Sequence, residues 1–426
     1  MKTAIVMMLL TMMVCGSCMG APSSLPPPAI PEGLGVNIHF AGSDMAQVNK
    51  IADAGFRFVR MDFGWGGVET KKGEYSFKIF DELVDSMAAR NIRVILILDY
   101  SNPIYENSAP PLTDEARAAF AAYAKAGAAH FKGRGVVWEI YNEPNGDWFW
   151  KQPKAEDYVK LAKVTYKAIK EADQDSVVIG PASCGSWARK YLEEAFKSGL
   201  LEYVDAVSVH PYGCKKPEDA NVFYSWLRRK ISQYGPKGAS RPIISGEWGY
   251  PSLPSSTFGD GVTLEGQADY LARMLLVNTM NGCPISIWYD WRNDGTGTNP
   301  GDREHNFGTL FFDFKEKPSY VAMKTLYKEL DGYSFVRRIS MGTINDYVIL
   351  LRKGGDYRIA AWTVGDAHTV SIPVDTPVVN VVSLMGDRKS MAVENETINV
   401  DLAGSVQYIE PAAPCRRWAL DTSWRK

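Results

Sequence analysis

The sequence repeats one pattern eight times between Leu34 and Leu330: a short apolar run followed by a longer stretch with apolar residues at helical spacing. The apolar runs are too hydrophobic to face water on either side, which indicates strands of a parallel sheet covered by helices. They are Leu34–Phe40, Phe56–Met61, Ile92–Leu98, Val136–Tyr141, Val177–Pro181, Val204–Val209, Pro242–Gly246 and Pro284–Tyr289. Eight such units predict an α/β fold of the (β/α)8, or TIM, barrel class over residues 34–332. An open doubly wound sheet is the alternative, but no glycine-rich phosphate-binding loop follows the first run.

Helix boundary signals fall between the apolar runs. Ser43 or Asp44 can cap the first helix and Gly55 marks its end, while Thr113 can cap the helix that follows the third run. Further helices are expected at Phe77–Arg90, Asp157–Ala172, Ser186–Lys197, Phe223–Tyr234, Leu264–Asn281 and Pro318–Leu330.

The character of the sequence changes after Leu330, where short β-branched runs are broken by Gly, Pro and Asp. These runs predict a small antiparallel, sandwich-like β domain over residues 333–412. We expect this domain to pack on the flank of the barrel, with carbohydrate binding as the alternative role. Residues 413–426 form a tail without a readable pattern. The runs are Phe335–Arg337, Tyr347–Arg352, Tyr357–Val364, Thr369–Val374, Val378–Leu384 and Thr397–Glu410.

The beginning of the chain has the layout of a secretory signal. Lys2 precedes an apolar block from Ala4 to Val14 that ends in small residues, which predicts a signal peptide over residues 1–20 and a secreted, periplasmic or cell-surface protein. The apolar block is too short to span a bilayer. A buried N-terminal helix and a lipoprotein anchor at Cys15 or Cys18 are the alternatives. The proline-rich residues 21–33 predict an extended linker.

Charge and cysteine content limit the possible partners. A formal net charge of -2 favours neither nucleic acid nor an acidic membrane surface as a partner. Cys184 and Cys214 each follow a predicted strand closely and are the one specific candidate for a disulfide, with free buried thiols as the alternative. Outside the predicted signal peptide neither CxxC nor HxH spacing occurs, and the histidines are scattered, so we expect no metal site and no cofactor.

Two of the predicted strands end in a glutamate. The fourth strand runs into Asn142-Glu143-Pro144, where the proline ends it, and the seventh runs into Glu247. The C-terminal ends of the strands are where barrel enzymes carry their chemistry. Two carboxylic acids there, one to donate a proton and one to act as nucleophile or base, are what hydrolysis of a glycosidic bond requires. Two solvated surface glutamates are the alternative.

The motifs around these glutamates resemble clan A of the retaining glycoside hydrolases, in particular families 5 and 39. The resemblance covers about residues 34–330 and depends on Asn142–Asn145 after the fourth strand and Ser245–Gly249 after the seventh. Phe58–Arg60, Val209–Tyr212 and Ile287–Asp290 support it. The segments most similar to secreted bacterial exopolysaccharide glycanases of family 39 are Asp99–Pro103, Gly246–Tyr250 and Glu304–Gly308.

The resemblance implies a carbohydrate substrate and catalytic roles for both glutamates. Glu143 would be the general acid and base, which calls for a raised pKa. Glu247 would be the nucleophile, kept ionised by Arg60 and hydrogen-bonded by Tyr212. Asn142 would bond the 2-hydroxyl group of the reacting sugar.

Further strand-end residues are expected to contact or organise the substrate site. Trp288 would form the apolar floor under the reacting sugar, and His210 either orients the catalytic cluster or is a satisfied core histidine. Many family 5 members carry a histidine after the third strand where this chain has Asp99, so their subsite contacts cannot be carried over. The other residues expected to bind substrate are His39, Asp99 and Trp248.

Seven tryptophans fall in loops after the predicted strands: Trp65, Trp148, Trp150, Trp187, Trp248, Trp288 and Trp291. We interpret them as stacking surfaces for several sugars along an open cleft, with some of them serving as packing residues. The loop at 293–307 is expected to form one wall of this cleft. The pattern favours endo action on a β-linked polysaccharide, with an exo-acting β-glycosidase such as a β-xylosidase as the alternative. A non-catalytic polysaccharide-binding protein fits less well, because both glutamates are present.

Overall fold

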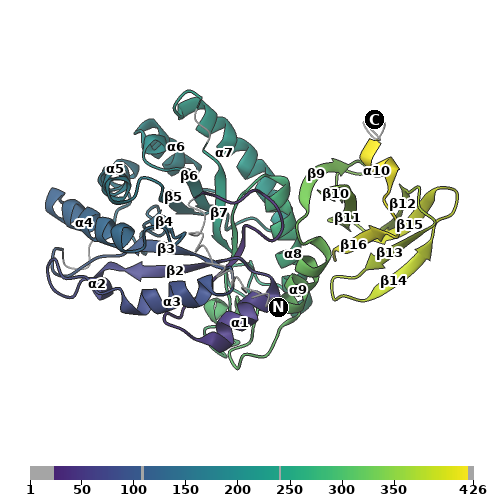
Figure 1. Cartoon of the computed structure of the whole chain (residues 1–426), viewed down its shortest axis with the longest axis horizontal. Helices are drawn as coiled ribbons and strands as arrows, with labels where there is room; N and C mark the ends of the chain where they lie inside the picture. The colour runs from purple at the N-terminus through teal and green to yellow at the C-terminus, as the bar shows by residue number, and fades with distance from the viewer. Residues whose placement is uncertain (1–23, 107–109, 239–240, 421–426) are drawn as a thin grey trace, which may run out of the picture.

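The computed structural model describes residues 24–106, 110–238 and 241–420. Its larger part is a closed parallel barrel of eight strands in chain order, with β1 hydrogen-bonded to both β2 and β8 (Figure 1). The predicted (β/α)8 barrel is therefore confirmed. Its strands are β1 (Leu34–Asn37), β2 (Phe58–Gly64), β3 (Arg93–Asp99), β4 (Val137–Ile140), β5 (Val177–Cys184), β6 (Ala206–His210), β7 (Ile243–Trp248) and β8 (Ser286–Trp288).

Helices surround the barrel and begin at the capping residues that the sequence indicated. The Asp44 side chain accepts hydrogen bonds from two backbone N–H groups in the first turn of α1, and Gly55 ends that helix with a φ of 92°. Thr113 caps α4 in the same way. The helices are α1 (Met45–Ala54), α2 (Trp65–Val68), α3 (Lys78–Ala88), α4 (Asp114–His130), α5 (Ala155–Ala172), α6 (Arg189–Lys197), α7 (Ala220–Tyr234), α8 (Leu264–Met280) and α9 (Pro318–Leu330). None of the helices in the described ranges has the length and apolar character needed to cross a bilayer.

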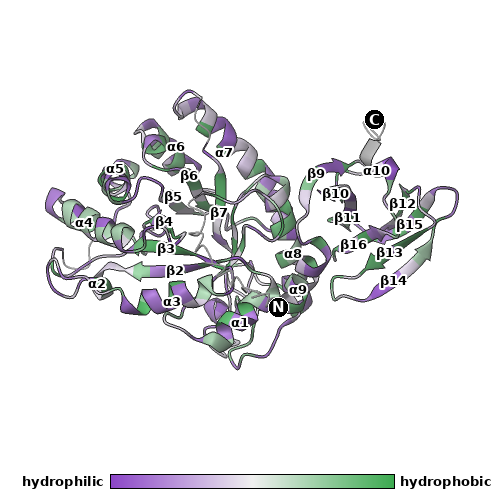
Figure 2. Cartoon of the chain, in the orientation of Figure 1, coloured by the Kyte–Doolittle hydropathy of each residue, from purple (hydrophilic) through white to green (hydrophobic). Residues whose placement is uncertain are grey.

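The interior of the barrel changes character along its axis. One half is filled by an apolar cluster that includes Phe58, Val137 and Ile244. Two residues further along β2 and β4, where side chains return to the same face, Arg60 and Glu139 replace the apolar side chains and are almost fully buried. Figure 2 shows the strands as largely hydrophobic and the outer faces of the helices as largely hydrophilic. The polar half of the interior lies at the C-terminal ends of the strands and positions the site.

The C-terminal part is a separate β domain, as the sequence predicted. A six-stranded antiparallel sheet in the order β14-β13-β16-β11-β10-β9 faces a two-stranded sheet of β12 and β15. The side chains between them form their own apolar core, which includes Val348, Ile372 and Trp418. The strands are β9 (Ser334–Ile339), β10 (Asp346–Lys353), β11 (Asp356–Thr363), β12 (His368–Pro373), β13 (Val378–Val382), β14 (Arg388–Ala392), β15 (Thr397–Leu402) and β16 (Gln407–Pro411).

Three details of this domain differ from the sequence prediction. The run Thr397–Glu410 is two strands, β15 and β16, which belong to different sheets. The mostly polar residues of β14 gave no strand pattern, although they pair with β13. The tail also contributes structure: Trp418, on the short helix α10 (Arg416–Leu420), is buried and its indole donates to the carbonyl of Pro373 at 2.8 Å.

The predicted proline-rich linker is not a free tether where the structure describes it. Ile30 is fully buried, and its backbone N–H donates to the carbonyl of Tyr333 at 2.9 Å. Ala29 forms a β-bridge with Ser334, so this segment packs at the junction of the barrel and the β domain. The predicted leader at residues 1–20 lies outside the described residues, and its role stays a prediction.

The candidate disulfide between Cys184 and Cys214 is not formed, and the alternative of free buried thiols holds. Cys184, Cys214, Cys283 and Cys415 are all free and buried. Because burial raises the pKa of each of these thiols, they behave as small apolar groups with a weak S–H donor.

The β domain is fixed to the barrel by buried charged groups. Glu218, in the loop after β6, accepts two hydrogen bonds from Arg273 of α8 at 2.8 and 2.7 Å. Its Oε1 also accepts from the indole N–H of Trp362 on β11 at 2.7 Å. At the same domain boundary, Glu329 of α9 forms ion pairs with Arg358 and Arg388 of the β domain. The prediction that the domain packs on the barrel flank is confirmed.

We predict that Glu218→Ala lowers the free energy of unfolding by about 3–5 kcal/mol, because it leaves the Arg273 guanidinium buried without its partner. Urea denaturation followed by circular dichroism measures this change. Glu194→Ala, which breaks an exposed pair with Lys190 on the outer helix α6, is the matched control and should leave the midpoint unchanged. Equal midpoints for both variants and the wild type would contradict the structural role of Glu218.

Candidate active site

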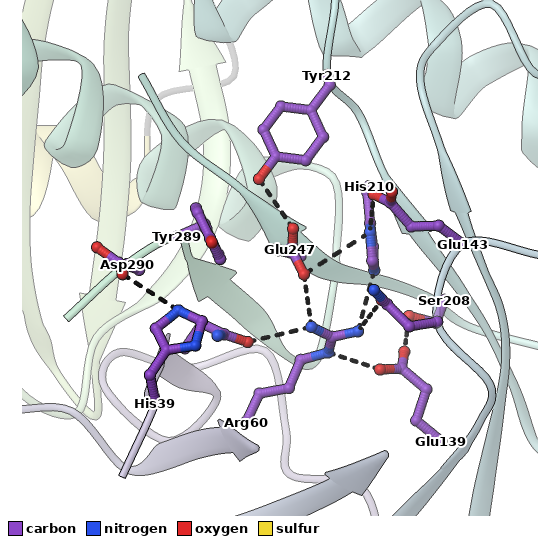
Figure 3. A network of polar contacts seen from close by, with 12 residues as sticks. His39, Arg60, Glu139, Glu143, Ser208, His210, Tyr212, Glu247, Tyr289 and Asp290 are labelled. Carbon is purple, nitrogen blue, oxygen red and sulfur yellow. Dashed lines mark hydrogen bonds and ion pairs between the residues drawn. The ribbon is translucent and has the colours of Figure 1, made fainter. Parts of the chain in front are cut away.

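Arg60 on β2 is the centre of the polar half of the barrel (Figure 3). Its Nε donates to Glu139 Oε2 at 2.6 Å, and its Nη1 donates to Glu247 Oε2 at 2.6 Å. Nη1 also donates to Asn37 Oδ1 at 3.1 Å, and Nη2 donates to Asn142 Oδ1 at 2.8 Å. One guanidinium therefore connects β1, β2, β4, the segment directly after β4, and β7.

Glu139 was not among the residues predicted for the site. It is fully buried in the middle of β4, where it accepts from Arg60 and from the hydroxyl of Ser208 on β6. Burial opposes the positive charge of Arg60, but the ion pairs with Glu139 and Glu247 raise its pKa above the ordinary value. The sequence did contain a signal for this role, because Glu139 lies inside an otherwise apolar strand. A buried carboxylate there needs a cation or several hydrogen-bond donors.

Glu247 at the end of β7 has both carboxylate oxygens occupied. Oε2 accepts from Arg60, and Oε1 accepts from the Tyr212 hydroxyl at 2.9 Å. The residue before it must be small: a Cβ on Gly246 would lie 2.3 Å from the Ser208 hydroxyl oxygen and 3.2 Å from Glu139. These donors hold Glu247 in one orientation.

Glu143 lies just past the end of β4, in a backbone conformation that few residues other than glycine adopt. Its φ is 46°, and that of Tyr141 is 64°, which costs about 1–3 kcal/mol for each residue unless the surroundings enforce it. Here the backbone N–H of Glu143 bonds to the carbonyl of Ala182 at 3.1 Å, and its own carbonyl accepts from the N–H of Gly146 at 2.9 Å. The strain turns the Glu143 side chain back over the mouth of the barrel.

The Glu143 carboxyl group is more acidic than the sequence analysis expected. Burial would raise its pKa, but hydrogen bonds from His210, Trp148 and Cys184 together hold the pKa below its ordinary value. His210 Nδ1 lies 2.9 Å from Oε1, and the indole Nε1 of Trp148 donates to Oε2 at 2.8 Å. The expected raised pKa is therefore wrong for this arrangement, because the donors outweigh the burial.

His210 of β6 connects the two glutamates. Its Nε2 lies 3.4 Å from Nη2 of Arg60. Because a guanidinium nitrogen can only donate hydrogen bonds, Nε2 is the acceptor, and Nδ1 carries the proton that is donated to Glu143. Nδ1 also lies 3.9 Å from Glu247 Oε2. Of the two interpretations for this residue, the structure therefore favours a histidine that orients the cluster, although it is completely buried.

The distance between the two glutamates is diagnostic of the reaction type. One carboxylate oxygen of Glu143, one of Glu247 and a ring nitrogen of His210 all lie within 4.8 Å of one another. Carboxyl groups about 5–5.5 Å apart are typical of retaining glycosidases, whereas inverting enzymes leave roughly 6.5–9.5 Å for a water molecule. An oxygen–oxygen separation below 4.8 Å agrees with the shorter of these two spacings.

The two glutamates open into a cavity of about 760 Å³, within the ~300–1,000 Å³ range typical of ligand sites. Five of the residues expected to bind substrate contribute to its lining, namely Asn142, Arg60, Tyr212, His39 and Trp248. His39 Nε2 lies 3.3 Å from Asp290 Oδ2, and this carboxylate raises the pKa of His39 to about 9 in spite of burial. His39 is therefore cationic at neutral pH.

Besides the fully buried His210, two residues of the predicted site do not reach the cavity. Trp288 is fully buried and directs its indole N–H to the carbonyl of Phe307 at 3.4 Å, so Tyr289 lines the cavity in its place. Asp99 is also fully buried and lies behind Asp62, which does line the cavity. Burial and the neighbouring Asp62 raise the pKa of Asp99 well above its ordinary value. In both cases the contacting residue is a near neighbour at a strand end, and sequence alone cannot tell which of them faces inward.

The seven tryptophans of the predicted loops divide into those that pack in the interior and those that line the cavity. Trp65, Trp150, Trp288 and Trp291 are buried packing residues. Trp148 and Trp187, 58% and 61% exposed, line the cavity on the side of Glu143, and Trp248 lines it while almost fully buried. Phe258, 64% exposed, lines the mouth as well and was not predicted, because a single phenylalanine in a polar loop gives no distinctive pattern.

Two side-chain clusters in the described part of the chain have the spacing of metal ligands. One is Glu143, His210 and Glu247, where the Arg60 guanidinium already neutralises the acids and would repel a cation. The other is His39, Asp290 and Asp294. Since the raised pKa keeps His39 protonated at neutral pH, a metal would have to displace that proton. The expectation of no metal and no cofactor stays a prediction.

A closed (β/α)8 barrel with paired glutamates after β4 and β7 defines the class of clan A glycoside hydrolases. In agreement with this, residues 32–294 match the model of a family described as Cellulase (glycosyl hydrolase family 5). Because that match covers more than half of the chain, the protein belongs to this family.

Individual relatives agree with the family assignment. A β-xylosidase of Geobacillus stearothermophilus is 31% identical over 177 residues, which are 37% of this chain and 34% of that protein. The matched region thus spans about a third of the relative's length. A family 39 glycoside hydrolase structure from Bacteroides cellulosilyticus superposes with a TM-score of 0.79 at 24% identity, covering 92% of this chain and 82% of that one. A monomeric β-xylosidase structure from Caulobacter crescentus has a TM-score of 0.66 at 20% identity over 91% and 98% of the two chains. At these identities the two structures show a shared fold.

Proposed function

We propose that the protein hydrolyses β-glycosidic bonds by double displacement, with Glu247 as nucleophile and Glu143 as general acid and base. The observation that carries this proposal is the pair of carboxylates whose oxygens lie within 4.8 Å at the floor of one cavity. Their surroundings differ in the way that the two roles require. Glu247 is fixed by a charged guanidinium and a hydroxyl, whereas Glu143 is held by a histidine and an exposed indole.

In the first step a Glu247 carboxylate oxygen attacks the anomeric carbon while Glu143 gives its proton to the glycosidic oxygen. The bond to the leaving group breaks, the leaving group departs as an alcohol, and a glycosyl ester forms on Glu247. Arg60 and Tyr212 keep the attacking carboxylate oriented. Asn142, whose Oδ1 is bound by Arg60 and whose Nδ2 donates to the Tyr100 hydroxyl at 3.1 Å, presents its amide to the 2-hydroxyl of the sugar.

In the second step Glu143, now ionised, removes a proton from water as the water attacks the anomeric carbon. The ester bond to Glu247 breaks, and the sugar is released with its original anomeric configuration. The hydrogen bonds that lower the Glu143 pKa keep the carboxyl group ionised, which is the form that accepts this proton.

Azide rescue of Glu247→Ala and Glu143→Ala tests both roles. We expect each variant to lose turnover, by about 10²–10⁴-fold for Glu143→Ala. Azide should restore activity to Glu247→Ala with an α-glycosyl azide as product, since azide replaces the nucleophile, and to Glu143→Ala with a β-glycosyl azide. The substrates are a panel of aryl β-glycosides and of plant and bacterial polysaccharides. Turnover by both variants at the wild-type rate would exclude the two-glutamate mechanism.

For the substrate we propose a β-linked polysaccharide cut at internal bonds. Trp148 and Trp187 on the Glu143 side and Phe258 elsewhere at the mouth are exposed aromatic side chains that line the cavity. Trp187 lies flat on two glycines, since a Cβ on Gly185 or Gly213 would meet its ring at 2.2 or 2.3 Å. Exposed rings held in place in this manner provide stacking surfaces for sugars beyond the reacting one.

Exo action, as in a β-xylosidase, is the second candidate, and the loops after β7 and β8 favour it. Arg303 lies over the rings of Phe258 and Phe307 at 4.6 and 5.0 Å and pairs with Asp260 at 3.2 Å. A backbone hydrogen bond from Thr257 to Pro300 at 3.0 Å also joins these loops. They thus form one continuous wall at the mouth, which narrows that side of the site. The β-xylosidase relative points in the same direction.

Product analysis on a ladder of β-linked oligosaccharides separates the two modes. Endo action predicts internal fragments and a kcat/KM that rises with chain length. Trp187→Ala should lower kcat/KM for the long substrates by roughly 2–10-fold through the loss of one stacking contact, with the shortest substrate as internal control. Release of single sugars from one end only would contradict the endo proposal and support the exo-acting candidate.

A further inference from the structure

Trp148 contacts the carboxyl group of the general acid directly. Its indole Nε1 donates to Glu143 Oε2 at 2.8 Å, although the side chain itself is 58% exposed. The bond spans five residues of the turn that follows β4. This turn is compact: Gly146 N–H bonds to the Glu143 carbonyl, Trp150 N–H bonds to the Gly146 carbonyl, and Gln152 N–H bonds to the Asp147 carboxylate.

The absence of a side chain at Gly146 allows the indole to occupy this place. A Cβ on Gly146 would lie 2.3 Å from Cε2 and 2.4 Å from Cζ2 of the Trp148 ring. Gly146 does not have a left-handed φ, so its backbone conformation is open to alanine. A methyl group there would push the indole away from Glu143 while leaving the indole in the protein.

The indole occupies the oxygen that catalysis needs. Oε1 of Glu143 faces the buried His210 and accepts its Nδ1 proton, so the proton that Glu143 delivers must be carried on Oε2. An N–H donor aimed at Oε2 stabilises the carboxylate and opposes protonation of that same oxygen. The leaving-group sugar must also approach Oε2, in the space where the exposed indole lies.

We propose that Trp148 is a positioning residue that keeps Glu143 ionised until the leaving-group side of the substrate displaces its indole. On displacement Oε2 loses one donor, takes a proton from a hydronium ion of the solvent and presents that proton to the glycosidic oxygen. After the alcohol has departed, the indole returns to Oε2 and keeps Glu143 ionised until Oε2 takes a proton from the attacking water in the second step. That proton passes to the solvent when the product leaves and the indole bonds to Oε2 again, so the cycle consumes no net proton. This inference depends on the proposed retaining mechanism and adds to it a switch between its acid and base halves.

The other groups around Glu143 do not move in this proposal. His210 from β6 and Cys184 from β5 donate to the carboxylate from buried positions. The charged groups nearest the cluster are Arg60 of β2 and Glu247 of β7, with Glu139 behind Arg60. The other charged groups that line the same cavity are His39, Asp62, Asp260, Arg303 and Glu304. Tyr212 is hydrogen-bonded to Glu247. Trp148 is thus the one exposed donor to Glu143 among the described residues.

Trp148→Phe and Gly146→Ala test the proposal by two independent routes. The first removes the N–H and keeps an aromatic ring, and the second keeps the indole but displaces it. Trp187→Phe is the matched control, because this second exposed tryptophan lines the same cavity and forms no described hydrogen bond with Glu143. Circular dichroism and unfolding midpoints confirm that each variant is folded.

The kinetic readout is the pH dependence of kcat and of kcat/KM for a substrate with an unactivated leaving group, for which the first step limits kcat. The basic limb of kcat/KM reports Glu143 in the free enzyme, and that of kcat reports Glu143 in the complex. Both test variants should move the basic limb of kcat/KM to higher pH and leave that of kcat in place. The ratio of the variant's kcat/KM to that of the wild type should then be several-fold higher at pH values above the wild-type basic limb than at pH values below it. Trp187→Phe should move neither limb.

A direct titration makes the outcome independent of turnover. The 13C resonance of the Glu143 carboxyl carbon, assigned by its absence in Glu143→Gln, should titrate at higher pH in Trp148→Phe and Gly146→Ala than in the wild type. Equal pKa values in all three proteins would overturn the proposal even if the enzyme is a retaining glycosidase. A shifted titration in a protein that hydrolyses none of the panel would instead support the Trp148 contact and refute the proposed function.

Discussion

The buried guanidinium of Arg60 is the constraint on which the site depends. A charge at 1% exposure is stable only when acceptors surround it, and here the acceptors come from Asn37, Glu139, Asn142 and Glu247. These residues lie on or just after three other strands of the barrel, so satisfying one charge also fixes where the nucleophile and the amide for the 2-hydroxyl lie. Glu139 supplies the second negative charge, so Arg60 keeps a charged partner at the stage where, in the proposed mechanism, Glu247 carries the glycosyl ester.

The two carboxylates that we propose as catalytic differ in whether their hydrogen-bond donors are fixed or exposed. The donors to Glu247 come from Arg60 and Tyr212, which are held by the barrel wall. Glu143 receives one bond from the buried His210 and one from the exposed Trp148. A nucleophile must keep one protonation state, whereas an acid and base must change its state twice in each cycle. A fixed set of donors suits the first task, and an exposed donor suits the second.

The sequence predicted the barrel and the β domain, and it placed Glu143 and Glu247 at strand ends, because each of these features has a local signature. Continuous apolar runs mark the strands, capping residues mark helices such as α1 and α4, and a proline ends β4 directly after Glu143. The inward or outward direction of neighbouring strand-end residues had no such signature. This is why Asp99 and Trp288 were assigned to the site, although Asp62 and Tyr289 are the residues that line it. The lowered Glu143 pKa depends on contacts from three different segments, which no reading of one segment can supply.

The central claim is a retaining reaction at Glu143 and Glu247, and the anomeric configuration of the first product tests it most directly. Proton NMR spectra recorded within the first minutes of hydrolysis of an unsubstituted β-linked substrate resolve the α and β anomeric protons of the newly released reducing end. The account predicts that the β-anomer appears first and that the α-anomer grows only later by mutarotation. Initial release of the α-anomer would contradict the double displacement and with it the assigned role of Glu247.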